Sequence, residues 1–165
     1  MVRLEAVLNS WKTVRQDTAQ AVAEMPELDY QPTPELLSFR ALAVHVLNAG
    51  HALTQLLVDG TEDMTAPGFR DKMGAYFLPV PADAEAGVLV EMLTSTLDAD
   101  VDVLASRPSD FWAGLITRFD GQRVTRLEML QFVKEHELTH RSQMFMYLRL
   151  KGIVPPTTRR KMAKK

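Results

Sequence analysis

Apolar side chains recur every three to four residues along four long stretches of the chain, at residues 2–25, 33–59, 83–106 and 125–151. This repeat places the apolar residues on one face of an α-helix and the polar residues on the other. A proline or a glycine, the residue types that end helices, lies within two residues of the end of each stretch. The pattern therefore predicts four helices that bury their apolar faces together, which is an all-α four-helix bundle.

Two of the predicted helices have characteristic first residues. Thr33-Pro34-Glu35 combines a capping side chain, a proline suited to the first helical position and an acidic group near the positive helix end. These residues predict the start of the second helix. Thr125 and Glu128 have the spacing of a capping box and predict the start of the fourth.

The connections between the predicted helices differ in length. Residues 61–82 are interrupted by glycine and proline, so we expect a long connection between the second and third helices, with at most a helical turn near residues 69–76. A connection of this length can cross from one end of a bundle to the other and lets those two helices run parallel. Before the fourth helix, Asp120-Gly121 lies between β-forming residues, which indicates a short hairpin or an extended loop.

Length and composition indicate a single domain. The chain has 165 residues, of which 46% are hydrophobic and 24% charged, with a formal net charge of −2. We expect one bundle domain over residues 1–156 and a basic, disordered tail over residues 157–165. Apart from that tail the charge gives no reason to expect nucleic acid as a partner.

The absence of cysteine narrows the chemistry. The chain contains no cysteine, which excludes disulfides, thiolate metal sites and cysteine nucleophiles. The first residues lack the apolar run of a signal peptide, and no window approaches 18 uninterrupted apolar residues. We therefore expect a cytoplasmic protein that does not use a membrane as a partner.

Three histidines are the main candidates for chemistry. His136 and His140 are four residues apart on the fourth predicted helix and lie in line with its apolar residues, so both imidazoles face inward. His45 lies on an inward face of the second helix, among the small or polar residues Ala41, Asn48, Ala49 and Ala52. Helical bundles build metal sites from such side chains on facing helices, and imidazole is a ligand of several divalent metals.

Other readings of the same residues stay open. Histidines spaced by four on a helix are often surface residues or hydrogen-bonded core residues. His136-Glu137-x-x-His140 also matches the zinc-protease pattern, although nothing else in the chain resembles a peptidase. His51 lies six residues after His45 and should point elsewhere, to the surface or to the edge of the site. Asp17 is expected on the polar side of the first helix, and the aspartates at 98, 100 and 102 indicate a solvated face on the third.

The histidine positions also carry a resemblance to a known family. His45, the run His136-x-x-x-His140-Arg141-x-Gln143, and the following Leu148-Arg149-x-x-Gly152 with Pro155-Pro156 resemble the DinB/YfiT-like superfamily. The resemblance implies a bundle with up-down-down-up topology that forms a homodimer. It also implies a divalent metal held by the three histidines. Nickel or zinc is the expected ion, with iron and manganese as further possibilities. Characterised relatives include thiol-dependent S-transferases and a mycothiol-dependent maleylpyruvate isomerase, in which the metal is thought to activate a small thiol.

These observations support two classes of function. The first is a metal-dependent enzyme acting on a small molecule. It would be an S-transferase that activates a low-molecular-weight thiol, or a hydrolase that uses metal-bound water. Asn48, Gln143 and Tyr147 would then orient substrate or water, and Arg141 would pack or pair at an interface. The second class is a non-catalytic dimeric module, for binding or structure, whose metal only joins the second and fourth helices. DNA repair, which the family name suggests, finds no basic groove in the sequence.

Overall fold

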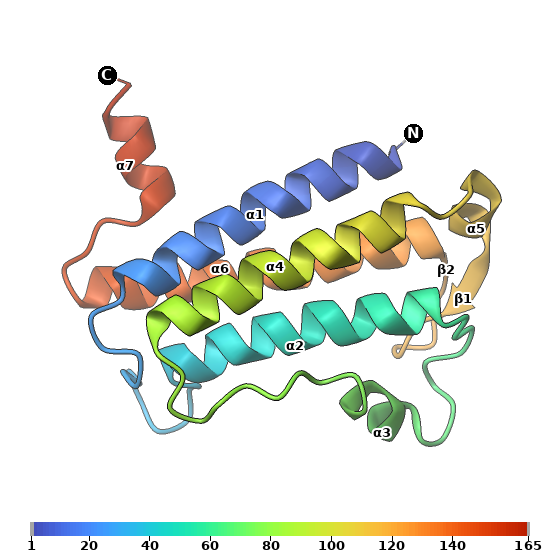
Figure 1. Ribbon diagram of the computed structural model, residues 1–165, viewed down its shortest axis with the longest axis horizontal. Coiled ribbons are helices and arrows are strands. Elements are labelled where there is room, and N and C mark those ends of the chain that lie inside the picture. Colours follow the sequence, from blue (N-terminus) through green and yellow to red (C-terminus); the bar gives the residue numbers. More distant parts are fainter. Residues whose placement is uncertain (1, 165) are drawn as a thin grey trace.

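The computed structural model describes residues 2–164 and is mostly helical, as the hydrophobic pattern predicted (Figure 1). Met1 and Lys165, which begin the predicted domain and end the predicted tail, lie outside the described residues. The elements are α1 (Leu4–Glu24), α2 (Phe39–Val58), α3 (Phe69–Gly74), α4 (Ala86–Ala105), α5 (Ser109–Ala113), β1 (Leu115–Thr117), β2 (Arg123–Thr125), α6 (Arg126–Leu150) and α7 (Pro156–Met162).

The long helices α1, α2, α4 and α6 pack side by side. Both α1 and α2 contact α4 and α6, which gives the order α1, α4, α2, α6 around the bundle. Figure 1 shows α1 and α6 running in one direction and α2 and α4 in the other. Residues 59–85, which include α3, pass back along the outside of α2 before α4 begins. The second and third long helices can run parallel because this connection returns the chain to its starting end.

The core consists of two apolar clusters with a polar layer between them. One cluster contains Trp11, Leu56, Leu97 and Met129, and the other contains Val22, Leu47, Leu89 and Met144, among further residues. Along both α1 and α6 the clusters are separated by a stretch that includes a buried charged residue, Arg15 on α1 and Glu137 on α6. The bundle therefore carries an ion pair halfway along its length, at the level of the predicted metal ligands.

Helix α2 begins later than predicted. Its N-cap is Ser38, whose side chain accepts a hydrogen bond from the backbone N–H of Ala41, so Thr33 is not the cap. The backbone N–H of Phe39 donates to the carbonyl of Tyr30, and Phe39 is completely buried. Because these contacts fix the chain at residue 39, residues 33–36 form a turn in place of the first helical turn.

The predicted hairpin and capping box are both present. Strands β1 and β2 pair antiparallel, with Ile116 opposite Val124 and Ile116 buried. The backbone of Thr117 also exchanges hydrogen bonds with Glu62 and Met64 of the long connection, which gives this short hairpin the packing partner it needs. Thr125 and Glu128 cap α6 reciprocally.

The prediction of a disordered tail differs from the structure. Residues Pro156–Met162 form α7, which stands outside the four long helices (Figure 1). Arg159 pairs with Glu24 and Arg160 with Asp17, both on α1. The basic residues are ordered because they meet carboxylates, and the expected boundary at residue 156 falls inside this helix.

Two aspartates expected on solvated faces are buried. Asp17 is 4% exposed and pairs with Arg141 and Arg160. Asp100 is 3% exposed and accepts hydrogen bonds from His51 and Gln55 on α2. The prediction was wrong at both positions because a carboxylate can be buried where cationic or polar partners surround it.

Helix α2 is the one helix of the described residues long and apolar enough to cross a membrane, by length and composition alone. Of its most apolar window, 56% is buried inside the bundle. That burial is typical of the core helix of a globular fold.

Candidate metal centre

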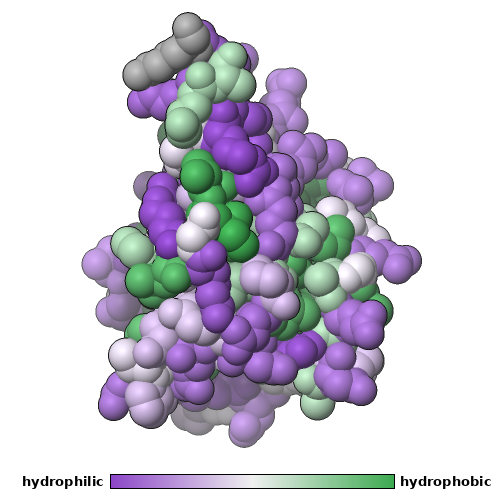
Figure 2. Space-filling view, turned by 90° about the vertical axis from the view of Figure 1, so that its left-hand side faces the viewer, coloured by the Kyte–Doolittle hydropathy of each residue, from purple (hydrophilic) through white to green (hydrophobic). Residues whose placement is uncertain are grey.

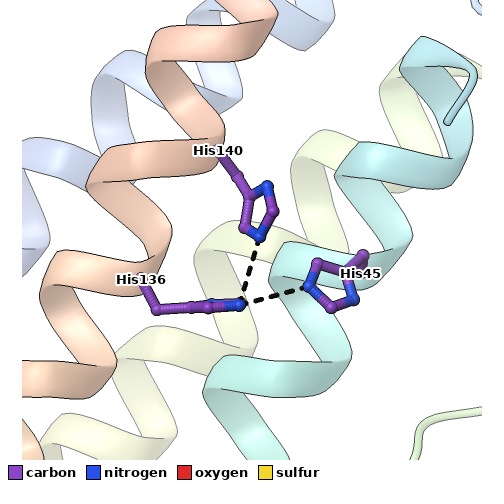
Figure 3. A group of neighbouring side chains, drawn as sticks. All are labelled: His45, His136 and His140. Atoms are coloured by element: carbon purple, nitrogen blue, oxygen red, sulfur yellow. Dashed lines mark hydrogen bonds between the residues drawn. The ribbon is translucent and has the colours of Figure 1, made fainter. Parts of the chain in front are cut away.

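The three histidines singled out by the sequence come together between α2 and α6. Their side chains converge, with His45 facing His136 and His140 across the gap between the helices (Figure 3). The Nε2 atom of His136 lies 3.2 Å from Nε2 of His45 and 3.1 Å from Nε2 of His140. One nitrogen from each ring falls within 4.8 Å of the others. Two separate helices thus present three nitrogen atoms to one point.

Rigid elements hold these rings in place. His136 and His140 lie one turn apart on α6, whose start is fixed by the capping box. Glu137, beside His136, points toward α1, where Nε and Nη2 of Arg15 donate to its carboxylate at 2.7 and 2.8 Å. The indole N–H of Trp11 donates to the same carboxylate at 2.6 Å. These contacts fix the rotation of α6 about its axis, and with it the direction of the two imidazoles.

A hydrogen bond orients the ring of His140. Its Nδ1 lies 2.7 Å from Oε1 of Gln143, one helical turn further along α6. An amide oxygen only accepts hydrogen bonds, so Nδ1 carries the proton and Nε2 keeps its lone pair. Metal-binding histidines commonly have such a partner on the second ring nitrogen. Gln143 therefore contacts a candidate ligand, as its position on the sequence suggested.

The spacing of the nitrogen atoms fits a divalent cation. Nitrogen ligands about 2.1 Å from a tetrahedral ion lie about 3.4 Å from each other. The separations of 3.2 and 3.1 Å from Nε2 of His136 are close to this value, and one nitrogen of each ring lies within 4.8 Å of the others. No Asp, Glu or further His of the described residues joins the group, since Glu137 is turned away. Three imidazoles with room for a further ligand match the donor set of catalytic sites.

The surroundings favour the neutral, metal-binding form of the imidazoles. Burial, with the charges of His140 and His45, lowers the pKa of His136 to about 4, although Glu137 acts in the other direction. Burial and the charge of His140 also lower the pKa of His45. At neutral pH these two rings are uncharged, so their lone pairs are available to a cation without loss of a proton.

Two cavities meet at the histidines. The larger, of about 760 Å³, is lined by His45 and His136 together with residues of α2, the long connection and the hairpin. The smaller, of about 480 Å³, lies toward the start of α2 and is lined by His45, Asn48, Phe77 and Val80, among others. His45, Ala49 and Met73 line both cavities. The site is therefore reached from two directions.

The remaining residues predicted for the site have varied positions. Asn48 lines the smaller cavity, but its Oδ1 already accepts a hydrogen bond from the backbone N–H of Leu78 and so holds the long connection. Tyr147 lies in the core, and its hydroxyl donates to the carbonyl of Leu37. It lines neither cavity, so the structure does not bring it to the histidines. His51 is turned to Asp100, away from the group.

The ion pair between Arg15 and Glu137 could hardly be predicted from the sequence. Arg15 and Glu137 are 122 residues apart in the sequence, so no local pattern connects them. Their positions among the apolar residues of their helices were one indication that both side chains are buried. Gly50 is a further sign, because a Cβ there would lie 3.1 Å from Nη2 of Arg15. The residues of the long connection that line the cavities follow no hydrophobic repeat, so the sequence did not indicate their role. Arg141, which was expected to pack or pair at an interface, forms an ion pair with Asp17 of the same chain.

Comparisons with known proteins agree with this architecture. The family model described as the DinB family matches residues 1–164. A protein of Bacillus subtilis strain 168 named "Uncharacterized protein YjoA" is 24% identical over 143 residues, covering 87% of this chain and 85% of that protein. The crystal structure of that DinB-like protein has a TM-score of 0.67 at 20% identity, covering 89% of this chain and 92% of its own. A DinB-like protein from Bacillus cereus ATCC 10987 gives 0.69 at 20% identity, with 93% and 95% covered.

Proposed function

The chain belongs to the DinB family, and from that premise we propose that it is a divalent-metal-dependent enzyme that transfers a low-molecular-weight thiol to a small electrophile. His45, His136 and His140 would hold the metal. The observation that carries the proposal is the convergence of three imidazole nitrogens at a point that borders two cavities. A bound divalent cation supplies Lewis acidity, which lowers the pKa of a ligated thiol and favours its thiolate.

The protein's own residues would position the reactants. The two cavities share His45, so each reactant can approach the histidine group from its own side. Ala49 lines both cavities, and its small side chain leaves room for the reacting groups beside His45. Gln143 keeps the proton of His140 on Nδ1, and the buried Glu137 fixes the rotation of α6. In this arrangement the chain contributes binding and orientation, which account for much of the rate gain in bimolecular reactions.

Further parts of the proposal come from the family. The metal is nickel or zinc, with iron and manganese compatible with the same nitrogen donors. The bundle has the family's up-down-down-up order. The location is the cytoplasm, where small thiols are kept reduced. The protein forms a homodimer, and the exposed Met146, Leu150 and Val154 near the end of α6 offer apolar area for such contact. Hydrophobic side chains gather among hydrophilic ones at this end of the molecule (Figure 2).

A metal that only joins α2 and α6 is the competing function. Structural zinc sites are closed by four protein ligands, whereas this group has three and borders open cavities. This difference favours a site that accepts an external ligand. A hydrolase using metal-bound water has the same requirement, so activity assays must separate it from thiol transfer.

The first test is the metal content and activity of the purified protein. Elemental analysis after supplementation with nickel or zinc should give about one ion per chain, and the double variant His136→Ala/His140→Ala should give none. The loaded protein is then assayed with cysteine, glutathione or coenzyme A against 1-chloro-2,4-dinitrobenzene, and with p-nitrophenyl acetate for hydrolysis. His51→Ala serves as the matched control. A protein that takes up no metal refutes the proposal, and hydrolysis without thiol transfer replaces the transferase with the hydrolase.

A further inference from the structure

We infer that the larger cavity is the binding site for a substrate with an uncharged aromatic body and a donor atom that reaches the histidine group. This inference rests on the proposed function, because it names the class of molecule that the metal centre would act on. It is carried by the composition of the cavity walls and by their position relative to His45 and His136.

Four parts of the chain form the walls of this cavity. Helix α2 contributes Leu53 and Ala49, and the long connection contributes Met64, Phe69 and Met73. The hairpin turn contributes Phe119, and α6 contributes Phe132. Apolar and aromatic side chains thus surround the space from segments that are distant in the sequence. Clefts of about 300–1,000 Å³ with such linings are typical of small-molecule sites, and this one measures about 760 Å³.

The aromatic wall is arranged to receive a ring. Phe119 and Phe132 meet edge to face, with ring centroids 5.3 Å apart. Arg118 lies over one face of Phe132, 5.0 Å from the ring centroid, and is held there by Asp120. Phe119 remains 45% exposed although it borders the cavity. A planar apolar ligand would cover this exposed aromatic surface and gain both burial and ring-to-ring contact.

The charges around the cavity argue against an ionic body. Arg70 and Asp71 are adjacent on α3, opposite in charge and both exposed, so they create no net preference for an anion or a cation. The uncharged Thr65 also lines the space. The polar atoms that remain are the imidazoles of His45 and His136 at one end. A ligand with its ring among the phenylalanines therefore directs its donor group to the histidines.

The smaller cavity offers an aromatic ligand fewer ring contacts. It measures about 480 Å³ and has Phe77 as its one aromatic residue, beside Arg40 and Asn48. Variants in this cavity can therefore serve as controls for variants in the larger one. Val80 lines only the smaller cavity, and Ala66 lines the larger but not the smaller.

The test compares two metal-binding probes that differ only in the aromatic ring. Acetohydroxamate and benzohydroxamate carry the same chelating group, so the ratio of their dissociation constants isolates the contribution of the ring. In the metal-loaded protein we expect benzohydroxamate to bind at least about tenfold more tightly, measured by calorimetry. Phe119→Ala and Ala66→Trp should each reduce this ratio at least about threefold, whereas Val80→Ala should leave it unchanged.

The possible results separate this inference from the proposed function. A ratio near one, or a ratio lowered only by Val80→Ala, overturns the inference while the metal site stands. A chain that takes up no metal removes the proposed function. The cavity is then tested in the metal-free protein with 2-naphthol, whose saturable one-to-one binding should disappear in Ala66→Trp. Absence of that binding in the unaltered chain contradicts an aromatic cavity independently of any metal.

Discussion

Replacing Glu137 with glutamine removes one charge from the ion pair with Arg15, in which both side chains are buried. The Arg15 and Glu137 side chains are 3% and 2% exposed, and the carboxylate accepts three hydrogen bonds, two from Arg15 and one from Trp11. Glutamine has nearly the same shape but leaves the guanidinium without a counter-charge. Breaking one side of a buried pair costs about 3–5 kcal/mol, a large part of the roughly 5–15 kcal/mol that stabilises a typical domain.

Urea denaturation followed by circular dichroism measures this cost. With a urea dependence of about 2 kcal/mol per molar, the midpoint should fall by roughly 1.5–2.5 M. Glu135→Gln makes the same chemical change two residues away on the exposed face of α6 and should shift the free energy of unfolding by less than about 0.5 kcal/mol. The pair of variants separates burial from the general effect of losing a carboxylate.

A double-mutant cycle identifies the cause. Arg15→Met combined with Glu137→Gln removes both charges and keeps an oxygen that can accept from the indole of Trp11. The double variant should be more stable than either single variant, because no unpaired charge remains in the core. The reasoning is refuted if Glu137→Gln loses less than about 1 kcal/mol, or if the losses of the two single variants simply add.

Three more predictions concern the histidine group and its surroundings. Gln143→Leu should weaken metal binding by about 10–100-fold, because the proton on Nδ1 of His140 loses its acceptor. Competition with a chelating dye measures the affinity, and the control variant His51→Ala should leave it unchanged. The metal-free protein should lose stability as the pH falls from about 6.5 toward 4, because unfolded histidine binds protons there and folded His136, with a pKa of about 4, does not; equal urea midpoints at pH 7 and pH 5 would contradict this. Gly50→Ala should not gain the roughly 1 kcal/mol of stability that alanine normally adds over glycine in a helix, because its Cβ would lie 3.1 Å from Nη2 of Arg15. In the Arg15→Met background the same substitution should recover part of that gain, measured by urea unfolding.

The sequence predicted the features that depend on local repeats. The helical period located the four long helices, the spacing of Thr125 and Glu128 located the start of α6, and Asp120-Gly121 located the hairpin. The three histidines were predicted to meet because each lay on an apolar face, and a side chain's face follows from the helical repeat alone.

Other features depend on partners that no local pattern specifies. Thr33 has a suitable sequence for a cap, but the contact between Phe39 and Tyr30 moved the helix start to Ser38. Asp17 and Asp100 were predicted to be solvent-exposed, because a charged side chain without a known partner is normally exposed. Both are buried in the structure. Their partners lie on other helices, so only the folded arrangement shows that burial is compensated.

The order of α7 has a similar origin. A short basic segment at a chain end usually stays solvated, and its helix alone would be unstable at this length. Here two arginines find carboxylates on α1, which supply the tertiary contact that helical propensity does not. Tyr147 was expected to orient substrate because it lies in line with the histidines on α6. In the structure its hydroxyl donates to the backbone carbonyl of Leu37, a contact that the helical repeat does not reveal.

The candidate ligands and much of the cavity lining come from different kinds of element, which has an evolutionary consequence. The nitrogen donors come from α2 and α6, which are anchored by the core, whereas much of the cavity lining comes from residues 59–85 and the hairpin. Mutations or insertions in those segments can reshape the space beside the histidines without moving the histidines themselves. Relatives can therefore diverge in the molecules they accept while the same three side chains are inherited unchanged.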